Sequence, residues 1–582
     1  MNVLWRIGGG LAMVALVAGC SKAPQRSGGT ADGEAAYDPA TDPLVNPATM
    51  TQEVVPAEAA LGEWLYCTLD GNPKSLNPLF GSSTYEFRMN GFLFDGPFTF
   101  DAEMRWKLND SMVESLDISE DQKVWTLTLK PGLTWHDGTP FTAHDIAFSW
   151  KEILDERVPC PAQKPGTDEI ERCEAVDDRT VRFVHKNALP TSKWNVFFSI
   201  IPKHVYEKGK EEDPTLQKSE YHARVNRAPV GNGPYRFVEW QENDKIVLER
   251  WDGYHGPKPH FARIVCRIIP DSNVQLLTFE KGDTDELRLD PKQFAVETVG
   301  SKSFARVGHK ALGTQWGFYY IGWNMDGSNP FFHDVRVRRA MTHALNLPLI
   351  IQEVGYNLVT PCHGIYHPEA PYAAKDIQLI PYDLEQAALL LDEAGWKVDE
   401  ETGWRTKDGT RFTFTLTIPQ GSSVSPQIAA IFEQDLRRIG VEMKQQVLEW
   451  ATFQQRTREA EFQAQIAGWG TGTDPDTGWN LWHSSEYKVG RNYGKYANAR
   501  VDELLKLGRF EFDEEKRFAY YAEMQRIIYD EQPYTFIWNA STLWGFNKRI
   551  RGVGFSPRGV WNFDPSSNAW WVHESEQMYG LK

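Results

Sequence analysis

The stretch WTLTLKPGLTWHDGTPFTAHDIAFSW, Trp125–Trp150, contains the signals of a strand, a turn and a helix start in one short run. Apolar and polar residues alternate from Trp125 to Leu129, as they do in a half-buried β-strand. Asp137-Gly138 is a turn signal, and Thr142 with Asp145 three residues later has the spacing of a capping box. A strand followed by a capped helix indicates a mixed α/β fold.

Strands and helices also alternate in the second half of the chain. Asp383 and Gln386 have capping-box spacing at the start of DLEQAALLLDEAGW, and SPQIAAIFEQDLRRIG (425–440) predicts a further helix. RFTFTLTI (411–418) predicts a half-buried strand, and another helix is expected to start near Asp513. No internal repeat or low-complexity tract follows residue 60, so these elements predict α/β lobes.

Composition limits the class of protein. The chain has 582 residues, enough for two to four domains of ordinary size, and its 22 tryptophans are typical of a surface that packs on ligands. The net charge is −17, and no long Lys/Arg run is present. Because an acidic surface repels phosphate backbones, we expect no nucleic-acid partner.

The N-terminus has the pattern of an export signal. Arg6 precedes an apolar run, Ile7 to Ala18, that is too short to span a bilayer. The run ends in LVAGC, which resembles the lipobox of bacterial lipoproteins and predicts lipidation of Cys20. Residues 21–60 are rich in Ala, Pro, Gly and Ser, so we expect a flexible tether there. No later segment reaches transmembrane length.

Five cysteines remain after lipidation, an odd number in an oxidising compartment. Cys160 and Cys173 flank the loop CPAQKPGTDEIERC, and we expect them to form a disulfide. Cys67 and Cys266 lie in strand-like runs and could be neighbours in a sheet, but the sequence alone does not pair them. Cys362 would then be free.

A second stretch, GWGTGTDPDTGWNLW (Gly468–Trp482), suggests a lined cavity, because glycine permits close backbone approach and tryptophan offers a large apolar face. Its Asp474 and Asp476 could hold a cation, act as acid and base, or cap a turn. GWGTGT lacks the basic residue and the immediate helix of a phosphate loop. The sequence also lacks the zinc-protease and serine-hydrolase motifs. We therefore expect no enzyme and no cofactor.

Two clusters contain residue types that bind metals: His136-Asp137 with His144-Asp145, and Cys362 with His363 and His367. In the first cluster both carboxylates have local roles in a turn and a cap. In the second, a closed tetrahedral site needs a fourth donor that the sequence does not supply nearby. We predict no metal site.

Several runs together resemble the family 5 extracellular solute-binding proteins, the peptide- and nickel-binding receptors of ABC importers, over roughly residues 61 to 560. They are SLNPLF (75–80), the stretch 125–150, PVGNGPYRFVEW (229–240), DVRVRRAMTHALN (334–346), YDLEQAALLLDEAGW (382–396) and GWGTGTDPD.

The resemblance implies a bilobal, hinged, α/β periplasmic-binding-protein fold of type II with an additional domain. Residues 1–20 would be the signal peptide and 21–60 the tether. Lobe I would comprise 61–95, 225–315 and 545–582, the additional domain 96–224, and lobe II 316–544. Ligand would contact both lobes only in the closed state and would therefore favour closure.

The resemblance also implies a ligand site between the lobes, where an extended peptide could add to exposed strand backbone. The residues expected there are Ser82, Trp323, Asn324, Trp469, Gly470, Thr471, Asp474, Asp476 and Trp479. The best-known peptide binders of the family have an aspartate three residues after the equivalent of Trp469, and this chain has Gly472. Asp474 could substitute for it, or the free amine of a peptide is not read.

The expected function is that of a receptor that captures an oligopeptide-like ligand and delivers it to the permease subunits of an ABC importer. It would work as a monomer, lipid-anchored on the periplasmic side of the envelope. Alternatives from other classes remain open: a sensor with the receptor fold, a binder of a non-peptide solute such as a sugar or metal chelate, or a hydrolase.

Overall fold

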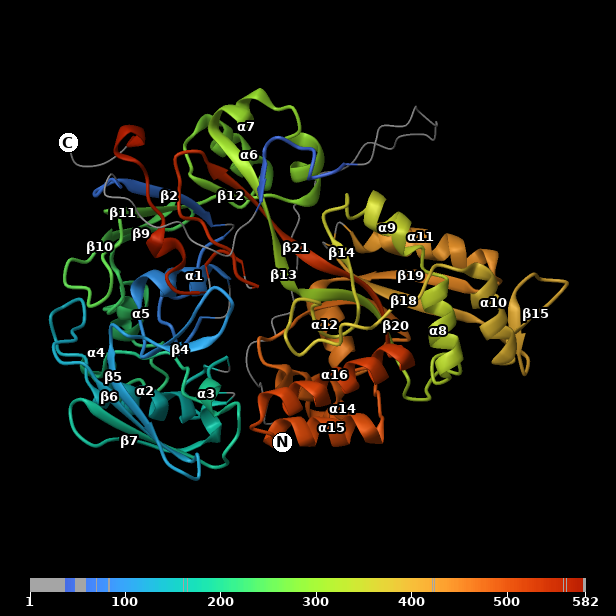
Figure 1. Ribbon diagram of the computed structural model, residues 1–582, viewed down its shortest axis with the longest axis horizontal. Helices are drawn as coiled ribbons and strands as arrows, with labels where there is room; N and C mark the ends of the chain where they lie inside the picture. Colours follow the sequence, from blue (N-terminus) through green and yellow to red (C-terminus); the bar gives the residue numbers. More distant parts are fainter. Residues whose placement is uncertain are drawn as a thin grey trace.

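The computed structural model describes residues 37–47, 59–69, 71–81, 84–160, 162–164, 166–420, 422, 424–557, 559–561 and 563–578. They form a bilobal α/β molecule with a third domain (Figure 1). In Figure 1 the two four-stranded sheets lie on the left and the largest sheet runs from the centre to the right. Among the described residues, no helix has the length and apolarity required to cross a membrane.

The sheet of lobe I has the order β2-β11-β10-β9. β2 is parallel to β11, and the other neighbours are antiparallel. Its apolar residues pack against helix α1 and the C-terminal segment. The elements are β2 (Trp64–Leu69), α1 (Thr84–Leu93), β9 (Tyr235–Gln241), β10 (Lys245–Arg250), β11 (Arg263–Ile268), α6 (Ser272–Lys281), η2 (Gln293–Glu297), α7 (Lys302–Val307), η4 (Ser566–Ala569) and η5 (Glu574–Glu576).

The third domain contains an antiparallel sheet of order β5-β6-β8-β7, against which α2 packs. The predicted strand and capping box are confirmed: β6 alternates half-buried and buried residues, and Asp145 and Thr142 make the reciprocal bonds that start α2. The elements are β3 (Phe98–Phe100), β4 (Trp106–Leu108), β5 (Val113–Ile118), β6 (Val124–Leu129), α2 (Ala143–Leu154), η1 (Thr167–Glu169), β7 (Ile170–Ala175), β8 (Thr180–His185), α3 (Ser192–Asn195), α4 (Lys203–Tyr206) and α5 (Glu220–Arg227).

The largest sheet has the order β12-β21-β13-β20-β18-β19. Its strands are β12 (Glu286–Arg288), β13 (Gly308–Trp323), β18 (Thr413–Pro419), β19 (Glu442–Leu448), β20 (Ala464–Gly470) and β21 (Tyr534–Asn547). Two short strands pair at its margins, β1 (Val45–Pro47) with β13 and β14 (Thr360–Pro361) with β21. A separate small sheet contains β15 (Lys397–Val398), β16 (Arg405–Lys407) and β17 (Thr410–Arg411).

Helices cover both faces of the lobe II part of this sheet, so the central strand β20 buries both sets of alternating side chains, whereas most side chains of the edge strand β19 are exposed. One face packs on α8, α10 and α11, and the opposite face packs on α13, α15 and α16. Asp383 and Asp513 cap α10 and α16 as predicted. The helices are α8 (Val335–His343), α9 (Leu347–Glu353), α10 (Leu384–Glu393), α11 (Ser425–Arg438), α12 (Trp450–Arg458), α13 (Trp479–Trp482), α14 (Glu486–Val489), α15 (Ala499–Phe510) and α16 (Glu514–Glu531).

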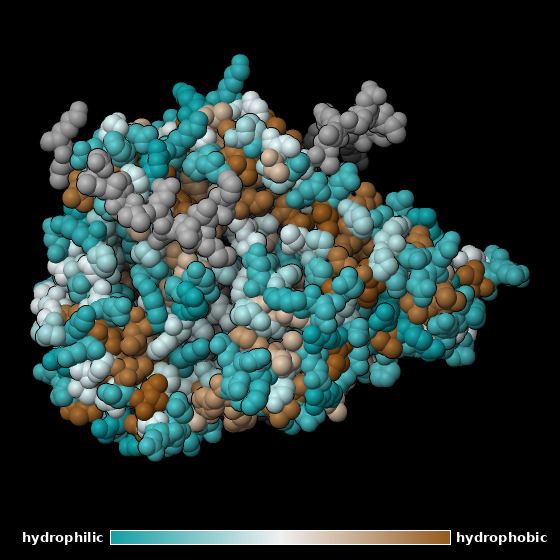
Figure 2. Space-filling view, in the orientation of Figure 1, coloured by the Kyte–Doolittle hydropathy of each residue, from teal (hydrophilic) through white to brown (hydrophobic). Residues whose placement is uncertain are grey.

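β13 and β21 connect the lobes. At one end β21 pairs with β12 of lobe I, and at the other end β13 pairs with β20 of lobe II. The β13–β21 register shifts between Thr314 and Phe318, and such an irregularity bends a strand pair. Both strands cross the expected lobe boundaries at 315 and 544, and the boundaries themselves stay a prediction. Figure 2 shows apolar residues gathered at the junction where these strands lie.

The expected Cys160–Cys173 disulfide is absent, and that prediction is wrong. Both thiols are free and buried, Cys160 in one apolar cluster and Cys173, on β7, in another. Burial raises the pKa of the Cys160 thiol to about 11. Cys67 on β2 and Cys266 on β11 are instead direct register partners and form a disulfide. The short loop between Cys160 and Cys173 was therefore a poor guide to disulfide pairing. Neighbouring strands instead brought together Cys67 and Cys266, which lie farther apart in the sequence.

Residues 37–47, here called the N-terminal strap, are an ordered part of the fold. β1 runs parallel to β13, and Asp42 forms an ion pair of 2.5 Å with Lys310 that is almost fully buried. Asn357 of lobe II donates a hydrogen bond to the Tyr37 carbonyl, and the Tyr37 ring meets Phe294 of lobe I edge-on. The expectation of a flexible tether is therefore wrong for these residues, because they find partners on both lobes and on the connecting strand.

Candidate ligand-binding site

Strand β20 has one edge that is mostly unpaired. β13 pairs with it along its whole length, from Ala464 to Gly470. On the other side β18 pairs only with Ala464 and Gln465. Within the described ranges, no strand continues that side of the ladder from Ile466 to Gly470. Addition of an extended peptide to this edge stays a prediction.

The cleft loop, residues 471–479, follows this edge and is held tightly. The Tyr372 hydroxyl donates a 2.7 Å hydrogen bond to the Gly472 carbonyl. A Cβ on Gly472 would lie 2.6 Å from Thr477 Cγ2, so a side chain there would displace Thr477. The close packing gives a physical reason why this chain has glycine where an aspartate stands in the best-known peptide binders.

Asp474 is buried and already neutralised. Arg517 donates to both of its carboxylate oxygens, at 2.6 and 3.0 Å, and the side chain also accepts from the backbone N–H of Asp476 at the start of η3 (Pro475–Gly478). Burial opposes the charge of Arg517, but Asp474 outweighs this and raises the Arg517 pKa. A bidentate, buried arginine leaves little capacity for a ligand ammonium group.

Asp476 has the same arrangement with a different partner. Arg509 contacts both carboxylate oxygens at 3.0 to 3.1 Å, and Tyr521 donates to one of them at 3.1 Å. The guanidinium of Arg509 also lies 3.9 Å from the ring centroid of Trp479, whose Nε1 donates to Glu486. The sequence analysis singled out the two aspartates and Trp479 of this loop. It did not identify Arg509 and Arg517, which form ion pairs with those aspartates.

The third domain reaches the cleft loop through an aromatic side chain. Trp194 of α3 donates from Nε1 to an Asp474 oxygen at 3.5 Å, although 280 residues separate them. Phe100 stacks on Trp194 with ring centroids 5.2 Å apart and lies tilted against Phe197 at 4.5 Å, and Phe197 is 44% exposed. These three rings form an aromatic group that meets lobe II through Trp194. Sequence reasoning missed it, because no local motif distinguishes them from other aromatic residues.

Lobe I contributes the remaining side of the site through its C-terminal segment. The Trp316 N–H donates to the Pro557 carbonyl at 3.0 Å, and the Thr471 N–H donates to the Trp316 carbonyl at 3.0 Å. Trp316 thus connects lobe I to the cleft loop. The structure brings Gly470, Thr471, Asp474 and Trp194 together where the two lobes and the third domain meet.

Trp323 and Asn324 are not cleft residues, and that expectation is wrong. Trp323 is fully buried and donates to Thr535 Oγ1, and Asn324 bonds two backbone carbonyls with its amide. Trp469 is also buried, but it belongs to the cluster on the opposite face of the sheet, beside Tyr320. Because side chains alternate along a strand, the two tryptophans point away from each other.

The other expectations divide by location. Cys20, the signal peptide and Ser82 lie outside the described residues. Ligand contact by residues 469–479 stays a prediction.

The histidine of the first candidate metal cluster has structural partners. Burial lowers the pKa of His136 to about 4, and its ring bonds the backbone of Gly231 and Gly233. In the part of the chain that the structure describes, no three His, Cys, Asp or Glu side chains are grouped as metal ligands.

Comparison with known proteins gives one consistent family. The sequence model of the bacterial extracellular solute-binding proteins, family 5 Middle, matches residues 107–489. Members of this family are solute-binding receptors rather than enzymes.

Individual relatives extend the match to most of the chain. The oligopeptide-binding protein AppA of Bacillus subtilis is 28% identical over 521 residues, 86% of this chain and 90% of the relative. The dipeptide-binding protein of Escherichia coli is 25% identical over 523 residues, 86% and 93% of the two chains. The structure of Bacillus subtilis AppA in complex with a nonapeptide matches with a TM-score of 0.70 and 27% identity, over 88% of this chain and 99% of that one.

Proposed function

Because the chain belongs to the bacterial extracellular solute-binding proteins of family 5, we propose that it is the substrate-binding receptor of an ABC importer and captures an oligopeptide between its lobes. The relatives named for oligopeptides and dipeptides, and the nonapeptide complex of one of them, support peptide as the class of ligand. Catalysis is not part of this proposal.

The observation that carries the proposal is the unpaired edge of β20. A peptide laid along Ile466–Gly470 would satisfy strand backbone groups without any demand on its sequence. The rings of Phe100, Trp194 and Phe197 would cover its side chains from the third domain. Main-chain pairing with an apolar cover suits a receptor for peptides of varied sequence.

The charges of the cleft loop suggest how the peptide ends are treated. Asp474 and Asp476 are each held by an arginine of lobe II, at 2.6 and 3.0 Å. Neither carboxylate is then available to bind an ammonium group at full strength. We infer that the receptor does not use these two residues to read a free amino terminus, which is the second of the two alternatives that Gly472 left open.

We further propose that the receptor is a monomer, lipid-anchored through Cys20 on the periplasmic side of the envelope, from which it delivers ligand to permease subunits. The lipobox-like LVAGC supports the anchor, and the family of extracellular binding proteins supports the compartment. Cys20→Ser should release the protein from washed membranes, and retention of that variant would contradict the anchor.

Backbone-methylated peptides test the strand-addition mode by calorimetric titration. Methylating an amide that pairs with β20 should weaken binding about tenfold, since one hydrogen bond is lost and a donor is removed. Methylating the next amide along, which points away from the strand, should have little effect. A uniform loss at all positions, or no loss at any, would contradict strand addition at this edge.

Acetylation of the peptide amino terminus is the complementary measurement. We expect free and acetylated peptides to bind within about threefold of each other, because no uncommitted carboxylate faces the cleft from residues 474 and 476. A tenfold or greater preference for the free amine would show that Asp474 or another acid reads it. Failure of every peptide to bind, with a different solute found by native mass spectrometry, would overturn the proposed ligand class.

A further inference from the structure

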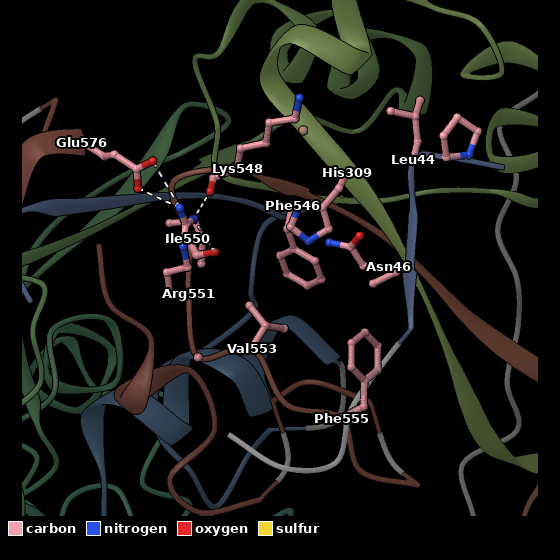
Figure 3. A pocket seen from close by; sticks show the side chains of 14 residues that line it. Leu44, Asn46, His309, Phe546, Lys548, Ile550, Arg551, Val553, Phe555 and Glu576 are labelled. Atoms are coloured by element: carbon pink, nitrogen blue, oxygen red, sulfur yellow. Dashed lines mark hydrogen bonds and ion pairs between the residues drawn. The ribbon is translucent and has the colours of Figure 1, made fainter. Parts of the chain in front are cut away.

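An open pocket of about 650 Å³ lies beside the connecting strands (Figure 3). This volume is in the range of sites that bind small molecules. We call it the hinge pocket. It is lined by Pro43, Leu44, Asn46, Gly308, His309, Ala311, Phe546, Lys548, Ile550, Arg551, Gly552, Val553, Phe555 and Glu576. None of these residues belongs to the cleft loop, so the pocket is separate from the proposed peptide site.

The floor of the hinge pocket is apolar. Ala311, Phe546, Ile550 and Phe555 are each at most 5% exposed, and Val553 adds a half-buried side chain. Phe546 and Phe555 meet edge-on with ring centroids 6.4 Å apart. Because these floor side chains are already almost fully buried, a ligand would gain apolar contact mainly from the half-buried Leu44 and Val553, at roughly 25 cal/mol per Å² of buried apolar area.

Two neutral polar side chains lie on one wall. Figure 3 shows the ring of His309, from β13, and the amide of Asn46, from the strap, turned toward each other at the edge of the same space. Burial lowers the pKa of His309 to about 4, and the positive charges of Arg551 and Lys548 act in the same direction. The imidazole is therefore neutral at physiological pH and offers one donor and one acceptor.

The opposite wall is cationic. Arg551 forms an ion pair of 2.9 Å with Glu576, but both side chains are about one-third or more exposed, so this pair contributes little to stability. The two terminal nitrogens of Arg551 already donate to Glu576 and to the carbonyls of Lys548 and Ile550, so among the described residues the Nε–H is the donor left for a second carboxylate. Lys548 contributes a further positive charge, while its ammonium group bonds the carbonyl of Ala305.

We propose that the hinge pocket is a second ligand site that takes a small amphipathic carboxylate, such as a medium-chain fatty acid. The apolar tail would lie against Leu44 and Val553, and the carboxylate would bind Arg551 in the field of Lys548. His309 and Asn46 would form hydrogen bonds with a polar group of the ligand or with a water molecule bound to it. Because the strap, β13 and β21 all line the pocket, an occupant contacts the two strands that join the lobes.

Calorimetric titration of the full chain with decanoate tests the proposal. We expect one saturable site, with decanol bound about tenfold more weakly because it lacks the charged group. Arg551→Gln should weaken decanoate about tenfold. Arg182→Gln, an exposed arginine on β8, is the matched control and should leave the affinity unchanged. Equal binding of decanol and decanoate, or no saturable binding, would overturn the proposal.

Two variants that fill the pocket keep the test independent of folding defects. Val553→Trp fills it from the floor, and Asn46→Trp fills it from the exposed strap; each should weaken decanoate at least tenfold. Unchanged affinity in both folded variants would place the site elsewhere. In the presence of a saturating peptide, the Kd for decanoate should change by less than about threefold. Competitive displacement would show that decanoate occupies the peptide cleft instead. Loss of peptide binding alone would contradict only the proposed function.

Discussion

Two buried ion pairs, one in the cleft loop and one in the N-terminal strap, have similar geometry but different freedom to separate. Asp474 and Arg517 lie 2.6 Å apart within lobe II, and both are embedded between α15, α16 and the cleft loop. Asp42 and Lys310 lie 2.5 Å apart, but Asp42 belongs to a strap that can detach from β13. Separating the first pair requires α16 or the cleft loop to leave lobe II, whereas separating the second requires only that the strap leaves β13.

This difference determines how much stability each ion pair should lose when one of its two residues is replaced. An unpaired charge that must stay buried costs several kcal/mol, because its desolvation is no longer compensated. An unpaired charge that can reach water by local detachment costs no more than the free energy of docking that segment. The same substitution chemistry should therefore give a large global effect in the loop and a smaller, local effect in the strap.

The largest effect is expected for Arg517→Met. It leaves Asp474 buried without its cation, so the free energy of unfolding should fall by about 3–5 kcal/mol, measured by urea denaturation. Arg500→Met removes an exposed pair with Glu523 and should cost less than about 1 kcal/mol. If both variants lost the same small amount, Asp474 would have an alternative partner or access to water, and the comparison would fail.

A smaller effect is expected for Asp42→Asn. The strap should detach and expose Lys310, which limits the loss of stability to about 1–3 kcal/mol. Hydrogen exchange should show lost protection at the Lys310 amide, which donates to the Leu44 carbonyl, while lobe II stays protected. Asp38→Asn, exposed in the same segment, is the control. Unchanged protection of the Lys310 amide in Asp42→Asn would show that the ion pair does not hold the strap.

The smallest effect is expected from acid on the strap. Burial would raise the pKa of Asp42, but hydrogen bonds from Lys310, the Leu44 N–H and Tyr37 outweigh it and lower that pKa below its ordinary 3.8. A lowered carboxylate pKa contributes stability that is complete above the unfolded value and is lost as pH falls through the folded one. Protection of the Lys310 amide, corrected for intrinsic exchange, should thus be constant down to about pH 4 and decline below 3.8.

In Asp42→Asn this decline should disappear, since the titrating group is gone. A decline that persists in the variant would assign the acid sensitivity to another carboxylate. Together the three measurements separate a pair that holds a lobe together from a pair that holds a segment onto it.

Elements whose signals are local could be predicted from the sequence. The alternation of β6, the Thr142–Asp145 capping box and the caps Asp383 and Asp513 all involve residues within a few positions of each other. The family resemblance supplied the bilobal arrangement. The Cys67–Cys266 disulfide could not be derived, because it depends on which strands become neighbours over a separation of 199 residues.

The candidate site was predicted by position but not by chemistry. Thr471 and Asp474 contact Trp316 and Trp194 where the lobes and the third domain meet, and their contact with a ligand stays a prediction. The partners that decide what these residues can do, Arg517 and Trp194, come from distant segments and carry no local signal. The face on which Trp323 points also depends on the strand register with β20, which single-sequence patterns do not determine.

The pairing of β13 with β21 sets the order in which the molecule can fold. Trp323 and Thr535, which bond across it, are 212 residues apart, and the contact of Glu63 with Met578 spans 515 residues. Closing such long loops costs entropy before any contact compensates for it, so folding is slow compared with helix formation. During synthesis β13 waits with an open edge until β21 emerges near the end of the chain, a state exposed to wrong strand pairing. Deleting residues 534–582, which include β21 and amount to less than a tenth of the chain, should therefore prevent both lobes from forming.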